Sequence, residues 1–519
     1  MSTAHLVGRF VADRARAASS AVAIDGGGVP VTYGELHERS AALAARLRAA
    51  GYGVGDRVAS LTRNSADHVV VFFACARAGL LLVPLSWRLA TAELTARLRH
   101  ADVALLLAED EFHGDANAAV AALPSPPPVV SLGQDGVERD VPARAAGPAP
   151  EGEPHDELPL LMLFTSGTGA GPKAALLTHS NCFWASLAAS RTLPITREDV
   201  VLSVMPQFHV GGWTIQALLA WWVGATVVLE RSFSPGRVLE LIAGKRVTTM
   251  MGVPSHYQRL AQHPAFAAAD LSSLRYAVVG GAPMPPAALR AWHDRGVNLA
   301  QGYGLTEASP NVLCLEPEEA RDRAGWAGRP YPHVDVALAD PVTGEPLPDG
   351  PGVGELLVRG PGVFAGYWRA PEATAWALRG GWLHTGDLAR RDGDGYHQII
   401  DRMDDVFISG GENVSPAEVE HVLSGHPAVA AAAVVGRPDP RWGEVGVAYV
   451  VTRPGCDTDA GELLGLCHRE LASFKVPVAV EFVAELPRSG LDKVLRRELR
   501  RRERDRHRPH CENSEEGAP

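Results

Sequence analysis

A loop rich in glycine and hydroxyl side chains is the first segment of the sequence that could do chemistry. An apolar run leads into Thr-Ser-Gly-Thr-Gly-Ala-Gly-Pro at 165–172, and Lys173 follows. Such a loop offers backbone N–H groups and hydroxyls to phosphate oxygens. It differs from the common P-loop because Pro172 precedes the lysine and Ala174 follows it, which leaves no hydroxyl for magnesium. Taken alone, an ordinary surface loop explains the glycines as well.

Four charged residues lie in turns or loops elsewhere in the chain. Glu307 follows a Gly-Tyr-Gly turn, where a carboxylate could ligate Mg²⁺ or simply cap a helix. Asp387 belongs to a Thr-Gly-Asp turn and could accept hydrogen bonds from both hydroxyls of a ribose, while Arg402 could face a phosphate. Lys493 lies in a loop that opens a basic helix.

Lysine is scarce in this chain, which makes each one informative. Only four of the 49 basic residues are lysines, namely Lys173, Lys245, Lys475 and Lys493. Where arginine serves, this chain uses arginine. A lysine that remains is therefore enriched for sites that need a compact ammonium on a flexible stem.

Composition limits the class of protein. Of 519 residues, 46% are hydrophobic and 21% charged, which is typical of globular domains and excludes a largely disordered or fibrous chain. The net charge of −11 gives no reason to expect nucleic acid or an acidic membrane as partner. No apolar run is long enough for a membrane span. The six cysteines form no C-x-x-C pair and the N-terminus is no secretory signal, so we expect a cytoplasmic protein.

The elements that must position these residues follow an α/β pattern. Helical and strand patterns alternate over 31–110 and again over 160–310, as in layered domains with a parallel sheet. Short strands separated by turn residues predict a β-rich subdomain over 330–400. A small α+β unit follows residue 401, and the Pro-, Ala- and Gly-rich stretch at 123–159 is expected to be a surface connection. The eight arginines between Arg496 and Arg508 are expected to form a solvated helix end.

Together these segments resemble one family, the adenylate-forming enzymes. That family includes acyl- and aryl-CoA synthetases, the adenylation domains of peptide synthetases, and luciferases. The resemblance extends over about residues 30–500, and its five motifs occur in order at ordinary spacing: Phe164–Ala174, Tyr303–Glu307, Thr385–Asp387, Asp401–Glu420 and Pro487–Arg500.

The resemblance implies two half-reactions and a set of nucleotide-binding residues. A carboxylate attacks the α-phosphate of ATP, and coenzyme A then takes the acyl group from the acyl-adenylate. Positions that match the family's phosphate loop are Thr165, Ser166, Gly167, Thr168 and Lys173. Glu307 would ligate Mg²⁺, and Thr306 would touch the α-phosphate. The rest of the nucleotide would lie against Gly302, Tyr303, Asp387 and Arg402, with Lys493 contacting the reacting carboxylate.

The same resemblance implies an acyl pocket without charge. His209, in an aromatic-His segment, would flank the reacting carboxylate or gate the thiol tunnel, although a lone histidine is often structural. Trp213 falls where long-chain fatty acyl-CoA synthetases carry a gating tryptophan. The other matched lining residues carry no charge, which favours a fatty or aromatic monocarboxylate; they are Met251, Gly252, Gly280, Gly281, Ala282 and Gly304.

Two domains and a hinge are also implied. We expect an N-terminal AMP-binding domain at 1–402 and a mobile C-terminal domain at 403–519, with the hinge at Asp404. Rotation would bring either Lys493 or the Gly410–Gly411 loop to the site, the latter lining a tunnel for the thiol.

Two positions depart from the family pattern. The phosphate loop has Gly169-Ala170 where Thr-Gly is usual, and Asp492 replaces the glycine before the catalytic lysine. These departures keep alternatives open: a carrier protein, an amine or an inorganic nucleophile as acceptor, or an inactive nucleotide-binding relative. A homodimer is also compatible with the sequence.

Overall fold

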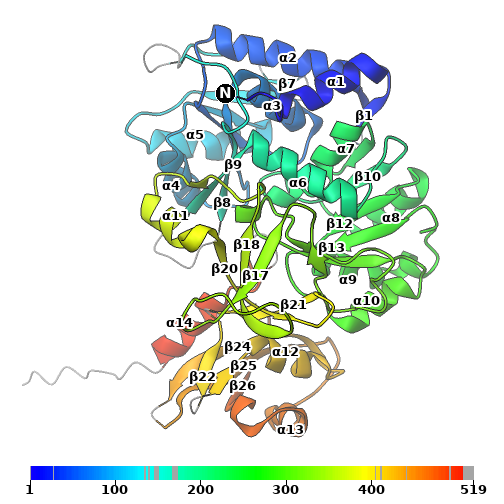
Figure 1. Ribbon diagram of the computed structural model, residues 1–519, viewed down its shortest axis with the longest axis vertical. Helices are drawn as coiled ribbons and strands as arrows, with labels where there is room; N and C mark the ends of the chain where they lie inside the picture. Colours follow the sequence, from blue (N-terminus) through cyan, green and yellow to red (C-terminus); the bar gives the residue numbers. More distant parts are fainter. Residues whose placement is uncertain are drawn as a thin grey trace, which may run out of the picture.

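A computed structural model gives the architecture of most of the chain. It describes residues 2–26, 29–133, 136–137, 141–144, 151–165, 173–403, 405–409, 412–439, 441–489 and 493–506. Several residues singled out by the sequence lie outside the described residues: Ser166, Gly167, Thr168, Gly169, Ala170, Asp404, Gly410, Gly411 and Asp492. In Figure 1 the C-terminal elements, in orange and red, lie below the rest of the chain, with β21 at the junction.

An eight-stranded sheet, in the order β19-β9-β8-β4-β3-β5-β6-β7, organises the first part of the chain. Its central strands pair in parallel, whereas β8 and β9 form an antiparallel hairpin. The strands are β3 (Arg57–Leu61), β4 (Leu81–Leu85), β5 (Leu105–Ala108), β6 (Val129–Gly133), β7 (Gly136–Val137), β8 (Pro159–Thr165), β9 (Lys173–Thr178) and β19 (Gly366–Tyr367).

Helices cover both faces of this sheet. Along β5, Leu105 and Leu107 pack into one hydrophobic cluster, while Leu106 and Ala108 pack into another on the opposite face. A strand buried on both faces carries apolar side chains throughout, which explains the unbroken apolar run at 103–108. The helices of this part are α1 (Gly8–Ala18), α2 (Tyr33–Ala49), α3 (Ala66–Ala78), α4 (Thr91–Ala101) and α5 (His113–Ala121).

One expectation for this part was wrong. The stretch at 123–159 is not only a surface connection, because it contributes β6, which pairs in parallel with β5, and the short β7. Val130 and Leu132 are buried while Val129 and Ser131 are half-buried, an alternation typical of a strand. The preceding prolines obscured this pattern, since proline is confined to the start or edge of strands.

A nine-stranded sheet carries the second α/β layer, in the order β16-β15-β14-β13-β12-β10-β11-β1-β2. Its six central strands are parallel. The strands are β1 (Val22–Asp25), β2 (Val31–Thr32), β10 (Val200–Ser203), β11 (Thr226–Leu229), β12 (Thr249–Gly252), β13 (Tyr276–Val279), β14 (Leu299–Tyr303), β15 (Leu313–Cys314) and β16 (Arg329–Pro330). The helices are α6 (His179–Thr192), α7 (Ala217–Val223), α8 (Pro235–Gly244), α9 (Pro254–Ala261) and α10 (Pro286–His293).

A separate antiparallel sheet confirms the β-rich subdomain. Its order is β17-β18-β20-β21, formed by β17 (Asp335–Ala339), β18 (Gly352–Arg359), β20 (Leu383–Arg391) and β21 (His397–Arg402), with α11 (Pro371–Ala377) before β20. Together with the two α/β layers, it confirms the predicted fold class.

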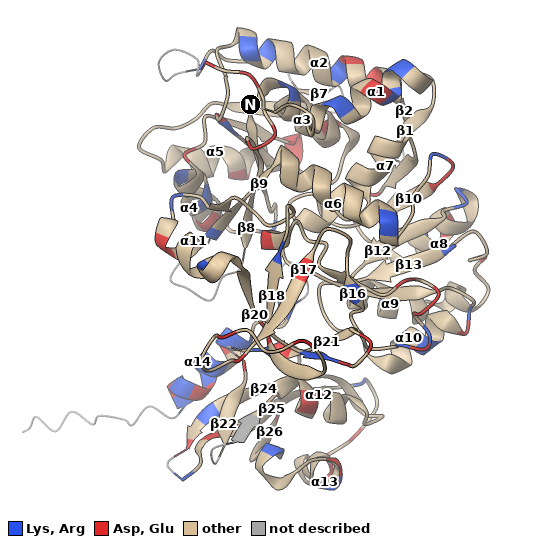
Figure 2. Cartoon of the chain, in the orientation of Figure 1, with Lys and Arg blue, Asp and Glu red and all other residues tan. Residues whose placement is uncertain are grey.

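The C-terminal unit has its own sheet and core. The strands are β22 (Phe407–Ser409), β23 (Glu412–Val414), β24 (Val429–Asp439), β25 (Gly443–Thr452) and β26 (Ala479–Phe482), and the helices are α12 (Pro416–Ser424), α13 (Ala460–Glu470) and α14 (Arg496–Arg506). Arginine residues are concentrated on α14 (Figure 2). Among the described residues, no helix is both long and apolar enough to span a membrane.

A largely buried ion-pair network fixes α14 to this unit. Arg496 donates to both carboxylate oxygens of Glu420, at 2.9 and 2.7 Å, and to Asp405 at 3.2 Å. Arg500 donates to the other oxygen of Asp405 at 2.6 Å. Burial raises the pKa of the Glu420 carboxyl, and Arg496 opposes that effect.

We predict that Arg496→Met lowers the free energy of unfolding by about 3 kcal/mol, because Glu420 is left buried without a countercharge. The loss should shrink at acid pH, since a carboxyl with a raised pKa accepts a proton on entering that range. Urea unfolding measures both effects. The matched control is Arg497→Met, whose guanidinium is exposed and unpaired among the described residues. Equal losses in the two variants would contradict the prediction.

Candidate active site

The predicted pocket segments meet at one edge of the nine-stranded sheet. β14, β13, β12 and β10 are parallel neighbours, so their carboxyl ends lie side by side. This edge is where open α/β sheets bind ligands. The residues it brings together are His209 and Trp213 after β10, Met251 and Gly252 on β12, Gly280, Gly281 and Ala282 after β13, and Gly302, Tyr303 and Gly304 at the end of β14.

The backbone approaches closely at two of these positions, and at Gly304 the approach requires glycine. A Cβ on Gly304 would lie 1.3 Å from the carbonyl oxygen of Pro310, which no side chain tolerates. A Cβ on Gly280 would lie 3.3 Å from the carbonyl oxygen of Gly302. The strand ends therefore present backbone rather than side chains to a ligand.

Asp387 joins three elements through its two carboxylate oxygens. The Tyr303 hydroxyl donates to Oδ2 at 2.5 Å, and Arg402 Nε donates to Oδ1 at 2.8 Å. Asp387 is buried, whereas Arg402 is half-exposed. Burial is the larger cause and the charge of Asp387 the second cause that raises the pKa of the Tyr303 phenol. The hydroxyl therefore remains a hydrogen-bond donor. Burial alone would lower the pKa of Arg402, but Asp387 raises it.

Hydrogen bonds to residues of β18 fix the turn that precedes Asp387. The Thr385 hydroxyl donates to the carbonyl oxygen of Leu356 at 2.7 Å and accepts from the Asp387 N–H at 3.1 Å. The Gly386 N–H donates to Glu355 Oε1 at 3.0 Å. The other oxygen of Glu355 lies 2.8 Å from Nδ1 of His384. Glu355 thus fixes the Thr-Gly-Asp turn on both sides.

Glu307 lies in a short 3₁₀ turn, Thr306–Ala308, that follows β14. Its backbone carbonyl accepts from the Phe364 N–H at 2.9 Å, and its Oε1 accepts from the Tyr367 hydroxyl at 2.8 Å. The other carboxylate oxygen has no hydrogen-bond donor among the described residues. Such an oxygen suits Mg²⁺, which commonly takes one or two carboxylates and completes its shell with phosphates and water.

The ends of the phosphate loop form a β-hairpin. Thr165 and Lys173 are paired opposite each other at the ends of β8 and β9. The Lys173 ammonium lies 5.2 Å from the centre of the Tyr367 ring. The loop between them, including Ser166, Gly167 and Thr168, lies outside the described residues.

Lys493 reaches this same site from the C-terminal unit. Its backbone pairs with Ser489, whose N–H donates to the Lys493 carbonyl at 2.7 Å. The side chain is open to solvent, yet protein around the ammonium and the charge of Arg402 lower its pKa. Asp387 and Glu307 act on that pKa in the opposite direction. The ammonium therefore lies within electrostatic reach of both carboxylates.

His209 is uncharged at neutral pH. Burial, followed by the charge of Lys493, lowers the pKa of its imidazole to about 3. Its Nε2 is buried and has no hydrogen-bond partner among the described residues. A neutral ring with a free nitrogen can exchange a hydrogen bond with a substrate but cannot form an ion pair with its carboxylate.

Trp213 is fully buried beneath the His209 segment. Its ring stacks on Phe72 with centroids 4.6 Å apart, and its indole N–H donates to the Gln207 carbonyl at 2.6 Å. His68 contacts the ring edge-on at 5.2 Å. The ring is fixed within the hydrophobic core, and its assignment to the acyl pocket remains a prediction.

Sequence reasoning missed Tyr367, Glu355 and His384. Each lies far along the chain from the residue it contacts, and each resembles an ordinary strand residue. The one local sequence signal is the glycine of the Gly-Tyr-Trp run at 366–368. In the structure Gly366 has a φ of +131°, a backbone conformation that favours glycine.

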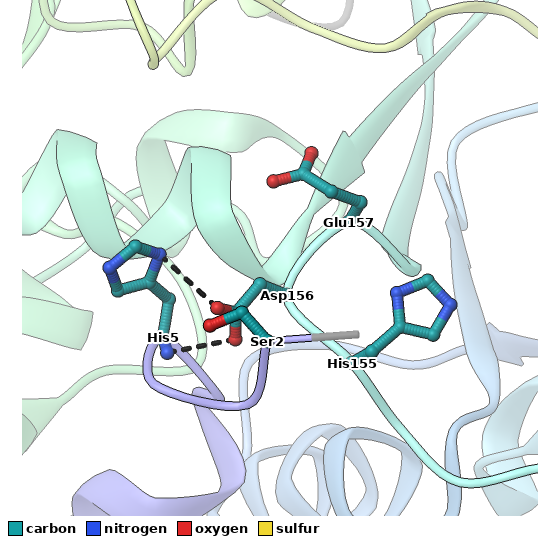
Figure 3. Close-up of a pocket in the computed structure, with 5 residues that line it drawn as sticks. All are labelled: Ser2, His5, His155, Asp156 and Glu157. Atoms are coloured by element: carbon teal, nitrogen blue, oxygen red, sulfur yellow. Dashed lines mark hydrogen bonds and ion pairs between the residues drawn. The ribbon is translucent and has the colours of Figure 1, made fainter.

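A hollow of about 380 Å³ lies elsewhere, lined by Ser2, His5, His155, Asp156 and Glu157 (Figure 3). His5 pairs with Asp156, both through its backbone N–H at 2.8 Å and through its ring at 3.5 Å. The His155 ring points away from this pair (Figure 3). None of the predicted site residues lines the hollow. Its polar contacts tie down the N-terminal segment, so we do not assign it as the active site.

Comparisons with known proteins match both the N-terminal and the C-terminal parts of the chain. The AMP-binding enzyme family matches residues 11–368, and the AMP-binding enzyme C-terminal domain matches residues 418–493. The chain belongs to the AMP-binding enzyme family. This confirms the resemblance drawn from the five motifs and the expectation of an AMP-forming ligase.

Individual AMP-binding enzymes are similar over nearly their whole length. The chain is 43% identical to a feruloyl-CoA synthase of Amycolatopsis sp, covering 96% of this chain and 99% of that one. It is 39% identical to the fatty acid–[acyl-carrier-protein] ligase ScoC of Streptomyces coeruleorubidus, covering 92% of each. The structure of ATP-bound MatB from Rhodopseudomonas palustris matches with a TM-score of 0.88 at 30% identity, covering 97% and 100% of the chains.

We predict that Asp387→Asn weakens ATP binding about tenfold or more, since hydrogen bonds to a charged group contribute about 1.5–3 kcal/mol. Isothermal titration measures the dissociation constant. The control is Asp335→Asn, which removes a similar Asp–Arg pair, 2.9 Å from Arg359, on the surface of the β-rich sheet. ATP affinity equal to the parent's in Asp387→Asn would remove Asp387 from the nucleotide site.

Proposed function

We propose that this AMP-binding enzyme activates a hydrophobic carboxylic acid with ATP and Mg²⁺ and transfers the acyl group to coenzyme A. The observation that carries the proposal is the convergence of Asp387, Glu307 and Lys493, from three different parts of the fold, on one sheet edge. Carboxylates suited to a ribose and a metal, with an ammonium within electrostatic reach of both, form a site suited to phosphoryl transfer.

In the first half-reaction, a carboxylate oxygen of the acid bonds to the α-phosphorus of ATP, and the bond to the β-phosphate breaks. Asp387 and Tyr303 hold the ribose end of the nucleotide, and Lys173 and Thr165 face the leaving pyrophosphate. Glu307 would hold Mg²⁺, and the bound ion would neutralise phosphate charge. Lys493 stabilises the negative charge that develops between carboxylate and α-phosphate. Thr306, beside Glu307, contacts the α-phosphate.

In the second half-reaction, the thiol sulfur of coenzyme A bonds to the acyl carbon, the bond to AMP breaks, and the thiol proton is released. We propose that the domains at 1–402 and 403–519 rotate about Asp404 between the two steps. Rotation withdraws Lys493 and brings the Gly410–Gly411 loop to the tunnel. Such motions exclude water and gate product release.

The acid in this proposal is uncharged beyond its carboxylate, and aromatic acids are favoured. The proposed lining has no charged side chain, and His209 stays neutral. The name of the 43% identical relative, a feruloyl-CoA synthase, supports an aryl acid. The lining residues are His209, Trp213, Met251, Gly252, Gly280, Gly281, Ala282 and Gly304.

A different acceptor is the second candidate. ScoC is named for transfer to an acyl-carrier protein, so adenylation followed by transfer to a carrier is supported by similarity. Pyrophosphate release and mass spectrometry of the products would also reveal an amine or an inorganic nucleophile as the acceptor. The same measurements would identify an inactive relative. The proposal also includes a cytoplasmic location, which cell fractionation tests. It further includes a homodimer, which light scattering tests.

The deciding experiment measures pyrophosphate release across a panel of carboxylic acids, followed by mass spectrometry of products with and without coenzyme A. Acid-dependent release with formation of acyl-CoA supports the proposal. Release without thioester points to another acceptor, and no release with any acid indicates an inactive relative.

We predict that Lys493→Ala abolishes acid-dependent pyrophosphate release but largely spares thioester formation from preformed acyl-adenylate. The reason is that Lys493 serves only one orientation of the C-terminal domain. The control Lys245→Ala removes a lysine that pairs with Asp25 at 2.7 Å, far from the site in the sheet order. Equal loss in both half-reactions would argue against two orientations.

We also predict that uncharged aromatic or medium- to long-chain aliphatic acids outcompete amino acids and dicarboxylates in kcat/KM. An additional charge in an apolar pocket without a partner costs several kcal/mol. A best substrate that carries a second charge would contradict the assigned lining.

A further inference from the structure

We propose that Tyr367 is a positioning residue that orients the Glu307 carboxylate for Mg²⁺ and the Lys173 ammonium for phosphate. The inference rests on the proposed function, because it concerns the same nucleotide site. It adds a residue that none of the five motifs contains.

The hydroxyl of Tyr367 fixes the metal-binding carboxylate. It donates to Glu307 Oε1 at 2.8 Å, and Phe364, three residues earlier, donates its N–H to the Glu307 carbonyl at 2.9 Å. One segment therefore holds both the backbone and the side chain of Glu307. With one carboxylate oxygen occupied, the rotation of the carboxylate is restricted and the other oxygen stays free of donors among the described residues.

The ring of Tyr367 supports the phosphate lysine. The Lys173 Nζ lies 5.2 Å from the ring centre, within the range of a cation–π contact. This contact holds the ammonium near the site without neutralising it. A carboxylate in the same place would compete with phosphate for the charge.

The backbone of Tyr367 is fixed on two sides. Strand β19 pairs with β9, placing Tyr367 opposite Ala175, two residues beyond Lys173. Its N–H donates to the Thr374 hydroxyl on α11 at 2.9 Å. Gly366 allows this packing, since a Cβ there would lie 2.7 Å from Thr374 Cγ2. The residue therefore has little freedom to move away from either partner.

The test separates the hydroxyl from the ring. Nucleotide binding is measured by isothermal titration without an acid substrate, so no turnover occurs. Mg²⁺ is varied for ATP, and AMP is titrated in EDTA as a metal-free reference. Tyr367→Phe should raise the Mg²⁺ concentration that half-saturates ATP binding about tenfold, the lower end for a hydrogen bond to a charged group. AMP affinity should stay within about twofold, because its ribose contacts are intact.

Removing the ring should add a second effect. Tyr367→Leu should also weaken ATP relative to AMP in EDTA, because Lys173 loses its support. In a Glu307→Gln background, Tyr367→Phe should cause no further change in Mg²⁺ dependence if it acts through Glu307.

The matched control is Tyr396→Phe. The Tyr396 hydroxyl also donates to a glutamate, Glu319, and Arg323 lies 4.1 Å from its ring centre, but this cluster is outside the proposed site.

An unchanged Mg²⁺ dependence in Tyr367→Phe, equal weakening of ATP and AMP, or the same shift in Tyr396→Phe would overturn the inference. Because coenzyme A and acid are absent, the shift can appear even if the proposed acceptor is wrong. Conversely, full ligase activity without the shift would reject only the role of Tyr367.

Discussion

The hydrogen bonds that Asp387 accepts from Tyr303 and Arg402 are the interaction on which the site depends. Tyr303 ends a strand of the nine-stranded sheet, while Asp387 and Arg402 pair directly across β20 and β21 of the β-rich sheet. This carboxylate therefore links two sheets that share no strand, in addition to the backbone bridge between Gly328 and His397. Because the chain enters the C-terminal unit just after Arg402, the same carboxylate also fixes the starting point of that unit.

Asp387 forms an ion pair with Arg402, but three other charges of the site have no ion-pair partner among the described residues. Lys173 rests on a ring, Glu307 accepts from a neutral phenol, and Lys493 lies near carboxylates without a direct ion pair among the described residues. An anionic substrate would therefore meet two ammonium groups, those of Lys173 and Lys493, that no carboxylate neutralises by direct contact. Preorganised charge of this kind needs little rearrangement when a reaction begins.

Much of this arrangement could be predicted from sequence. Glu307, Asp387 and Lys493 stood out because each is a charged residue in a turn or loop, and five motifs in order identified the family. The α/β layers followed from apolar runs such as 103–108. Tyr367 could not be found in this way, because an aromatic residue next to a glycine looks like core. Its role depends on β19 joining β9 across nearly 200 residues, which no local pattern contains. The neutral state of His209 likewise depends on burial that spacing does not report.

Asp401 has a mechanical consequence for the chain. Its buried carboxylate accepts from the Ser415 hydroxyl at 2.6 Å and from the Ala417 N–H, at the start of α12, at 3.0 Å. Asp401 precedes residue 404, whereas both donors follow it. The contacts of Asp405 with Arg496 and Arg500, by contrast, stay within the C-terminal unit and travel with it. The proposed rotation about residue 404 would break the two hydrogen bonds of Asp401, so their strength would contribute to the barrier for leaving the present orientation.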